Sequence, residues 1–276
     1  MHENFSFRKV VVGNKPYAYV LNKSDLTDLT QKDRILSKLE KEGYAPTYFT
    51  NLRDSSDKTY RQILPNIISQ IESQYRFNRE LVTNFHLLVV GVPNVGKSTL
   101  INRLRNFHLK KGNAVKAGGE PGITRAVQSK VKINNNPLVY IYDTPGVLEP
   151  RFENIETGFK LACLNCVKNH QVNSDILADY LLYKLNKTKN FKYVEFYNLE
   201  VPSDNILEVL LHIAKSKSKI KQLKGFDNSN KKIYDIDAAG HMMIKHYFDG
   251  HLGKSMLDDD LITDLIQDDL NLEKFV

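Results

Sequence analysis

In the first 150 residues, short apolar runs alternate with longer stretches in which apolar positions recur at helical spacing. The short runs predict buried strands at 17–21, 47–50, 85–90, 126–133 and 138–142. The longer stretches predict helices at about 26–42, 57–75 and 99–109. This alternation is typical of an α/β domain with a doubly wound, mostly parallel sheet.

Strand signals fade after residue 152, and the apolar spacing that follows is mostly helical. It predicts helices at about 156–169, 174–186, 203–217 and 235–249. We therefore expect an α/β domain over residues 1–170 and a small helical domain over residues 171–276.

A glycine-rich loop joins the strand expected at 85–90 to the helix expected at 99–109. Its sequence at 91–98, Gly-Val-Pro-Asn-Val-Gly-Lys-Ser, fits the phosphate-loop pattern G-x-x-x-x-G-K-[ST]. Backbone N–H groups of such a loop curl around phosphates, while Lys97 reaches the β and γ oxygens and Ser98 ligates Mg²⁺. The residues expected to bind nucleotide here are Asn94, Val95, Gly96, Lys97, Ser98 and Thr99.

Two further segments carry groups that a nucleotide and its metal ion require. Asp-Thr-Pro-Gly at 143–146 ends a predicted strand, where Asp143 can hold Mg²⁺ through water and the Gly146 N–H can meet the γ-phosphate. Thr124 lies in an irregular segment between a helix and a strand, where its hydroxyl can complete the metal shell. Alone, each signal is weak, because D-x-x-G is common and threonine often starts a strand. Together with Ser98 they predict a Mg²⁺ site.

Asn-Lys-Ser-Asp at 22–25 follows its own predicted strand and matches the guanine-reading pattern N-K-x-D. The carboxylate of Asp25 can accept two hydrogen bonds from guanine, from N1–H and the 2-amino group, a pair that adenine does not offer. Lys23 can lay its aliphatic stem over the base, and Asn22 can tie this loop to the phosphate loop. GTP is therefore the favoured ligand, and ATP the less favoured one.

The order of these motifs is unusual, because the base-reading element comes first and the phosphate loop follows it. A compact domain tolerates such a rotation of the chain, since sites assemble in space and surface loops can host new termini. With this order the chain resembles the circularly permuted YlqF-type GTPases, and among them their mitochondrial branch. Further similarity lies in Tyr-Phe-Thr-Asn at 48–51, Ala-Asp-Tyr-Leu-Leu-Tyr at 178–183 and Gly-Lys-Ser-Met-Leu-Asp at 253–258.

The resemblance implies a circularly permuted P-loop GTPase that hydrolyses GTP to GDP during late assembly of the large ribosomal subunit, and so supports mitochondrial translation. It implies that Thr50 and Asn51 belong to the loop that supports the base. It also implies that Asn94 helps to bind K⁺ beside the β–γ bridge, so that Lys97, Thr124 and Asn94 form the catalytic set. A mitochondrial location rests on the resemblance alone, because no transit peptide is visible.

Family members begin with a basic helix, an F-P-G-H-M-type motif and an extra strand ending in D-A-R, none of which is found in residues 1–15. By family topology that strand lies inside the sheet, between the strands at 86–90 and 17–21. We expect that the natural start lies upstream of Met1. The alternative is that residues 5–13 fill the gap.

The chain carries a net charge of +7 and has a pI near 9.1, which favours an acidic partner such as nucleic acid or an anionic membrane surface. Residues 184–232 alone hold 11 Lys and 5 Asp or Glu. Such spacing suits phosphate contacts with structured ribosomal RNA, read by shape rather than by base. The alternative is a solvated linker. No DNA partner is expected, and no apolar stretch is long enough to span a bilayer, although peripheral membrane association stays open.

The two cysteines, Cys163 and Cys166, cannot form a disulfide framework and indicate a reducing compartment. With His170 they could supply three metal ligands, but a fourth is not evident, so buried core residues are the favoured interpretation.

Two other functions compete with a GTPase. Val147 stands where many GTPases carry a water-positioning Gln, so turnover should be slow, and a switch with negligible intrinsic hydrolysis is one alternative. An RNA-binding protein with a vestigial pocket, or an inactive truncated form, is the other, and the intact motifs argue against it.

Overall fold

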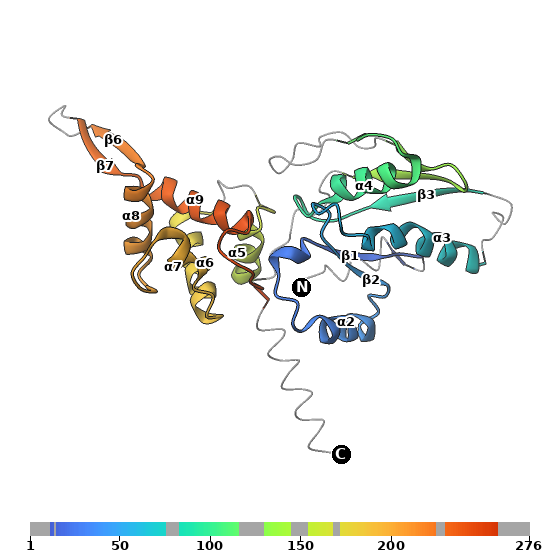
Figure 1. The fold of residues 1–276 in the computed structure, drawn as a ribbon, viewed down its shortest axis with the longest axis horizontal. Coiled ribbons are helices and arrows are strands. Elements are labelled where there is room, and N and C mark those ends of the chain that lie inside the picture. Colours follow the sequence, from blue (N-terminus) through green and yellow to red (C-terminus); the bar gives the residue numbers. More distant parts are fainter. Residues whose placement is uncertain are drawn as a thin grey trace, which may run out of the picture. The chain divides into compact units, whose positions relative to one another are not determined.

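The computed structural model describes residues 12–13, 15–75, 83–115, 130–144, 154–167, 172–224 and 230–258. The chain forms two compact units, of which the second spans Phe152–Asp259. Figure 1 shows strands and helices interleaved in the first unit and mainly helices in the second. Among the described helices, none combines the length and the hydrophobicity needed to cross a membrane.

The strands of the first unit lie in two sheets. In one, β1 (Tyr19–Asn22) pairs in parallel with β2 (Thr47–Thr50). In the other, β5 (Leu138–Asp143) lies between β3 (Asn84–Val89), its parallel partner, and the antiparallel β4 (Lys130–Asn134).

The single doubly wound sheet that we expected is therefore divided in two over the residues that the structure describes. Within that part of the chain, β1 and β3 each pair with one strand only. The expected gap between them is thus present in the described residues. Most of residues 5–13, the proposed filling segment, and the question of an upstream start lie outside them.

The first unit has five described helices, η1 (Ser24–Leu26), α2 (Lys32–Lys41), η2 (Thr59–Gln62), α3 (Ile63–Ser73) and α4 (Lys97–Leu109). Of these, η2, α3 and α4 contribute buried residues to the same core as the strands. On α4 the buried Leu100, Ile101 and Leu104 recur at helical spacing and share one core with Phe85 of β3 and Ile141 of β5. This packing places the first turn of α4 beside the carboxyl ends of β3 and β5.

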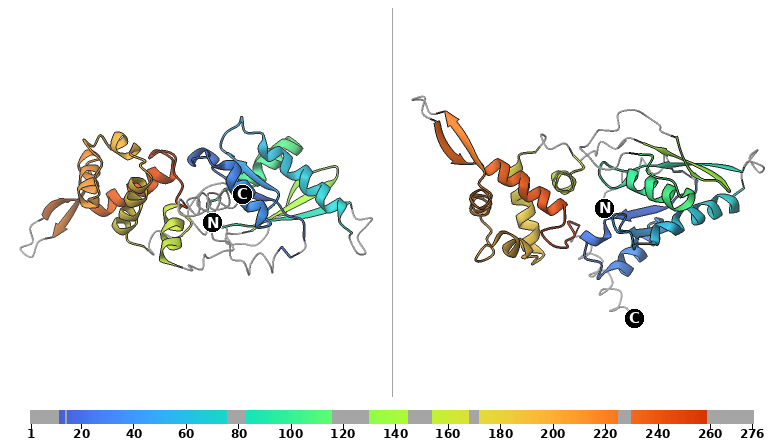
Figure 2. Two further views of the ribbon diagram at one scale, coloured as in Figure 1. Left: turned by 90° about the horizontal axis from the view of Figure 1, so that it is seen from below. Right: turned by 45° about the horizontal axis from the view of Figure 1, so that its top comes forward.

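The second unit has five described helices around its own core, with an antiparallel hairpin between the last two (Figures 1 and 2). The helices are α5 (Ile155–Cys163), α6 (Ser174–Lys187), α7 (Lys192–Tyr197), α8 (Ile206–Ser216) and α9 (Ile236–Phe248). The hairpin consists of β6 (Ile220–Lys224) and β7 (Asn230–Tyr234).

These elements add detail to two expectations. The second domain is mostly helical, as expected, and the β6–β7 hairpin adds two short strands to it. The second unit also begins earlier than residue 171, because α5 buries Ala162 and Cys163 in the same core as Leu181 of α6. We therefore propose a domain limit near residue 152.

Both cysteines lie in this second core. Cys163 is fully buried, and burial raises the pKa of its thiol to about 12. Cys166 is also buried, and its Sγ lies 3.5 Å from the Leu164 carbonyl oxygen. Their positions are those of core side chains, while His170 lies outside the described residues.

Candidate nucleotide-binding site

The loop at 91–98 lies between the end of β3 and the first turn of α4, as predicted. Asn94 (φ 60°) and Gly96 (φ 107°) are both in left-handed conformations, which curl the backbone. The Nζ of Lys97 donates to the carbonyl oxygens of Gly91 and Val92, each at 2.9 Å, and so lies across the loop. Such a curled loop at a helix N-terminus suits an anion.

Asn22, at the end of β1, joins three segments through its amide. Its Nδ2 donates to the Val95 carbonyl oxygen of the phosphate loop at 2.9 Å. Its Oδ1 accepts from Leu52 N at 3.1 Å and from the Thr50 hydroxyl at 3.4 Å. The expected tie between the base-reading loop and the phosphate loop is therefore present.

Gly96 permits this tie by having no side chain. A Cβ built on Gly96 would lie 2.3 Å from Nδ2 of Asn22, which is closer than real contacts allow. The left-handed φ also favours glycine. Two independent constraints therefore require glycine at this position.

The proposed metal ligands from α4 and β5 lie close together. The Ser98 hydroxyl lies 3.5 Å from Asp143 Oδ2, and Asp143 is buried. Burial raises the pKa of this carboxyl, while Lys97 and the Ser98 hydroxyl lower it by less. Thr144 donates to the Val89 carbonyl oxygen at 2.7 Å and so holds the end of β5 against the end of β3.

A hydroxyl beside a buried carboxylate offers the hard oxygen ligands that Mg²⁺ prefers. No cluster of three or more His, Cys, Asp or Glu ligands occurs in the described part of the chain. In P-loop sites Mg²⁺ is shared between two such side chains, nucleotide phosphates and water. Thr124 and Gly146, the other residues expected near the γ-phosphate, lie outside the described residues.

The segment proposed to read the base leaves β1 in a tight turn. Lys23 adopts a left-handed conformation (φ 63°), and the exposed Asp25 follows within η1. After β2, Thr50 is fully buried, and the Asn51 side chain accepts from Arg53 N at 3.2 Å. These two loops meet at Asn22, so they border the same space as the phosphate loop.

Sequence reasoning missed Arg103, which braces the loop after β2. From α4, its Nε donates to the Leu52 carbonyl oxygen at 3.0 Å and its Nη2 to the Arg53 carbonyl oxygen at 3.2 Å. Asp57 caps the other side of this loop, accepting from Thr59 N at 2.7 Å. Burial opposes ionisation of Asp57, but its hydrogen bonds with the backbone N–H groups of Thr59 and Asn51 hold its pKa below the usual range.

Asn102 was also missed. It is buried on α4, where its Nδ2 donates to the Val115 carbonyl oxygen at 2.7 Å, and its Oδ1 accepts from Ala114 N at 3.0 Å and Val115 N at 3.1 Å. These contacts anchor the chain directly before the segment that carries Thr124. The helix that holds the phosphate loop thus also fixes two of its neighbours.

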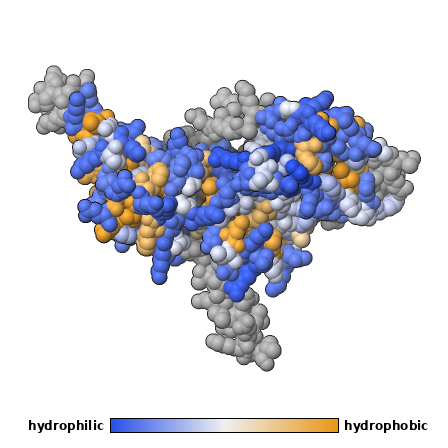
Figure 3. All heavy atoms as spheres, in the orientation of Figure 1, coloured by the Kyte–Doolittle hydropathy of each residue, from blue (hydrophilic) through white to orange (hydrophobic). Residues whose placement is uncertain are grey.

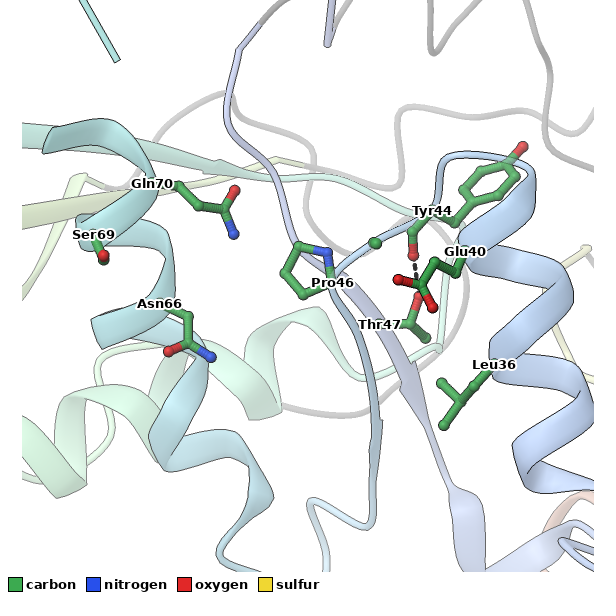
Figure 4. Close-up of a pocket in the computed structure, with 9 residues that line it drawn as sticks. Leu36, Glu40, Tyr44, Pro46, Thr47, Asn66, Ser69 and Gln70 are labelled. Atoms are coloured by element: carbon green, nitrogen blue, oxygen red, sulfur yellow. Dashed lines mark hydrogen bonds between the residues drawn. The ribbon is translucent and has the colours of Figure 1, made fainter. Parts of the chain in front are cut away.

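A hollow of about 750 Å³ lies elsewhere on the first unit, between α2, β2 and α3. Figure 4 shows Pro46 at its centre, with Asn66 and Gln70 of α3 on one side and Leu36 and Glu40 of α2 on the other. None of its lining residues belongs to the nucleotide motifs, so it is separate from the site described above.

Comparison with known proteins finds relatives along most of the chain. A family model described as a 50S ribosome-binding GTPase matches residues 86–234. Mitochondrial ribosome-associated GTPase 1 of Xenopus tropicalis is 44% identical over 250 residues, which cover 90% of this chain and 80% of that protein. Ribosome biogenesis GTPase A of Bacillus licheniformis is 32% identical over 210 residues, 75% of this chain and 70% of that protein. Among solved structures, GNP-bound YlqF from T. maritima has a similar fold, with a TM-score of 0.50 and 19% identity over 86% of this chain and 78% of that one.

Proposed function

Because the chain belongs to the YlqF-type family of ribosome-binding GTPases, we propose that it hydrolyses GTP in the mitochondrion during assembly of the large ribosomal subunit. The observation that carries this proposal is the Asn22 bridge, which joins a guanine-reading sequence to a phosphate loop. The names of the relatives, which include mitochondrial ribosome-associated GTPase 1 and ribosome biogenesis GTPase A, support the ribosomal and mitochondrial parts.

In this proposal the residues divide into three groups. Asp25 and Lys23 select guanine, supported by Thr50 and Asn51. Lys97 and the loop N–H groups hold the β- and γ-phosphates, and Gly146 senses the γ-phosphate. Ser98, Asp143 and Thr124 hold Mg²⁺, which would neutralise charge on the phosphate oxygens when bound.

Turnover is expected to be slow without the ribosome, because Val147 cannot orient water as a Gln side chain does. Asn94 is proposed to help hold K⁺, whose charge would assist at the β–γ bridge. Hydrolysis should then be faster in potassium than in sodium buffer, and Asn94→Ala should abolish this difference. Equal rates in both buffers would remove potassium from the proposal.

Large-subunit RNA is proposed to dock on the second unit. Lys217 and Lys221 are exposed and Lys219 is half-buried. Lys184, in contrast, is buried and lies 3.2 Å from Glu156, so this lysine of the basic segment belongs to the core. The docking surface is therefore proposed around the hairpin rather than over the whole of residues 184–232.

Charge reversal tests this docking surface. Changing Lys217, Lys219 and Lys221 to Glu should weaken association with large subunits and flatten its salt dependence, with nucleotide affinity unchanged. A variant with the same net charge, made by changing Lys32, Lys38 and Lys41 of α2 to Glu, is the control. Equal losses in both variants would mean that general charge, and not this surface, governs docking.

GTP turnover with and without mitochondrial large subunits tests the central proposal. We expect slow hydrolysis by the protein alone and a marked increase when subunits are added. Nucleotide binding without turnover in either condition would instead support the alternative, a nucleotide-dependent RNA-binding switch with negligible hydrolysis.

A further inference from the structure

The β6–β7 hairpin presents one face to which two of the described side chains of each strand belong. In its antiparallel register Ile220 lies opposite Tyr234, and Gln222 lies opposite Lys232. Directly opposed residues project from the same side of a sheet, as do residues two apart on a strand. Ile220, Gln222, Lys232 and Tyr234 therefore share one face of the hairpin.

Both residues of the apolar pair on this face are exposed. Ile220 is 53% exposed and Tyr234 is 41% exposed. Figure 3 shows apolar side chains on this part of the second unit bordered by hydrophilic ones. Packing of Ile220 against Tyr234 across the strands accounts for the pairing of these residues. It does not account for the aromatic and aliphatic surface that stays exposed.

The sequence around the pair is rich in lysine. Residues 215–235 hold seven Lys and two Asp. The Nζ of Lys215, from the end of α8, lies 5.8 Å from the centre of the Tyr234 ring, and Lys232 follows on the same face. Lys221 and Asp235 lie 3.9 Å apart, and this pairing offsets part of the charge. An exposed ring among lysines suits a partner that is flat, aromatic and anionic.

We propose that this face binds an unpaired RNA base, stacked on Tyr234 and Ile220, with neighbouring phosphates on Lys215 and Lys232. This inference rests on the proposed docking of the second unit on RNA, and adds a stacked base to recognition by shape. A single-stranded nucleotide offers the face of its base, which a continuous duplex keeps stacked inside.

A lipid surface fits the face less well. An element that lies on a membrane surface buries one apolar face in the lipid and keeps its polar groups on the opposite face. Here the apolar pair Ile220 and Tyr234 closes the ladder next to the helices, and the polar pair Gln222 and Lys232 lies further out on the same face. This order of apolar and polar pairs agrees better with bound RNA, whose base would lie on the pair next to the helices and whose phosphates would lie along the lysines.

The test measures binding of the full chain to three probes: an unstructured 12-nucleotide RNA, a duplex RNA of the same length, and vesicles containing 20% cardiolipin. Tyr234→Leu should weaken binding to the single strand about 5- to 150-fold, the range expected for one stacked base. Tyr234→Phe keeps the ring and should stay within about twofold. The control is Tyr183→Leu, which changes another exposed tyrosine of the same unit, at 58% exposure.

The salt dependence separates stacking from charge. Tyr234→Leu removes no charge, so its salt slope should match that of the unaltered chain, whereas Lys232→Gln should reduce the slope by about 0.7. Equal affinities of Tyr234→Leu and the unaltered chain for the single strand would overturn the stacked base but leave salt-dependent RNA docking in place. A loss confined to vesicles would replace RNA by lipid. Absence of salt-dependent RNA binding by the unaltered chain would overturn the docking proposal as well.

Discussion

Arg103 connects the helix of the phosphate loop to the loop after β2, and its removal tests whether that loop positions the base. In Arg103→Ala, the carbonyl oxygens of Leu52 and Arg53 lose their guanidinium donors, at 3.0 and 3.2 Å. No residue proposed to contact nucleotide is altered. Any change in nucleotide affinity must therefore arise from the position or mobility of the loop.

The size of the effect follows from those two contacts. A hydrogen bond with one charged partner contributes about 1.5–3 kcal/mol when well buried. Arg103 is only half-buried, so solvent replaces part of each contact. A total of about 1–2 kcal/mol remains, which corresponds to a GDP dissociation rate about 5- to 30-fold faster.

Arg105 provides a matched control on the same helix. It donates to the carbonyl oxygens of Gly112 at 3.1 Å and Lys132 at 2.9 Å, and so makes two similar contacts away from the base loop. Stopped-flow dissociation of a fluorescent GDP should be accelerated in Arg103→Ala and little changed in Arg105→Ala. The melting temperature should fall by a similar amount in both variants.

A second measurement separates an effect on base binding from an effect on phosphate binding. Tripolyphosphate contacts no base loop, so its affinity should be the same for Arg103→Ala and the unaltered chain. Equal dissociation rates for the two arginine variants, or an equal loss of tripolyphosphate binding, would refute the idea that Arg103 acts through the base loop.

Three further variants test the rest of the site. Asp25→Asn should weaken GTP binding by about 2–4 kcal/mol and strengthen binding of xanthosine triphosphate in competition titrations, and a change within twofold would move the base elsewhere. Gly96→Ala should weaken GDP binding at least about tenfold, because its Cβ meets Asn22 at 2.3 Å, and adding Asn22→Ala should remove part of that loss in a double-mutant cycle. The folded-state pKa of Asp143 is raised, so the free energy of unfolding falls as pH rises from the unfolded pKa through the folded one. Asp143→Asn should accordingly raise the melting temperature of the nucleotide-free protein and remove the Mg²⁺-dependent part of GTP affinity, whereas a lowered melting temperature would contradict this reasoning.

Local parts of the fold could be predicted from the sequence. The apolar run at 85–90, the glycine loop and the helix at 99–109 are neighbours in the chain, and β3, the loop and α4 occupy those places. The run at 47–50 coincides with β2. Such elements are specified by short-range periodicity and by turn residues, which need no knowledge of distant partners.

Other parts depend on contacts that leave little trace in the sequence. In β6, Ile-Lys-Gln-Leu-Lys has only two apolar positions, so its lysines dominated the pattern and the hairpin was missed. The assignment of α5 to the second unit depends on which of the two cores buries Ala162 and Cys163. Helical spacing in the sequence does not show which core that is. The partners of Arg103 are backbone carbonyls about fifty residues upstream, and backbone atoms carry no residue identity.

The Asn22 amide also makes the two ends of the site thermodynamically interdependent. A GTP molecule would reach from the base-reading loop to the phosphate loop, and one side chain holds both. Ordering one loop then lowers the entropy that remains to be lost at the other, so guanosine and tripolyphosphate added as separate molecules should each increase the affinity of the other. A compound with guanine but without the triphosphate, or with the triphosphate but another base, then loses more binding free energy than its missing contacts alone would supply. Tight binding therefore requires both parts of the nucleotide in one molecule.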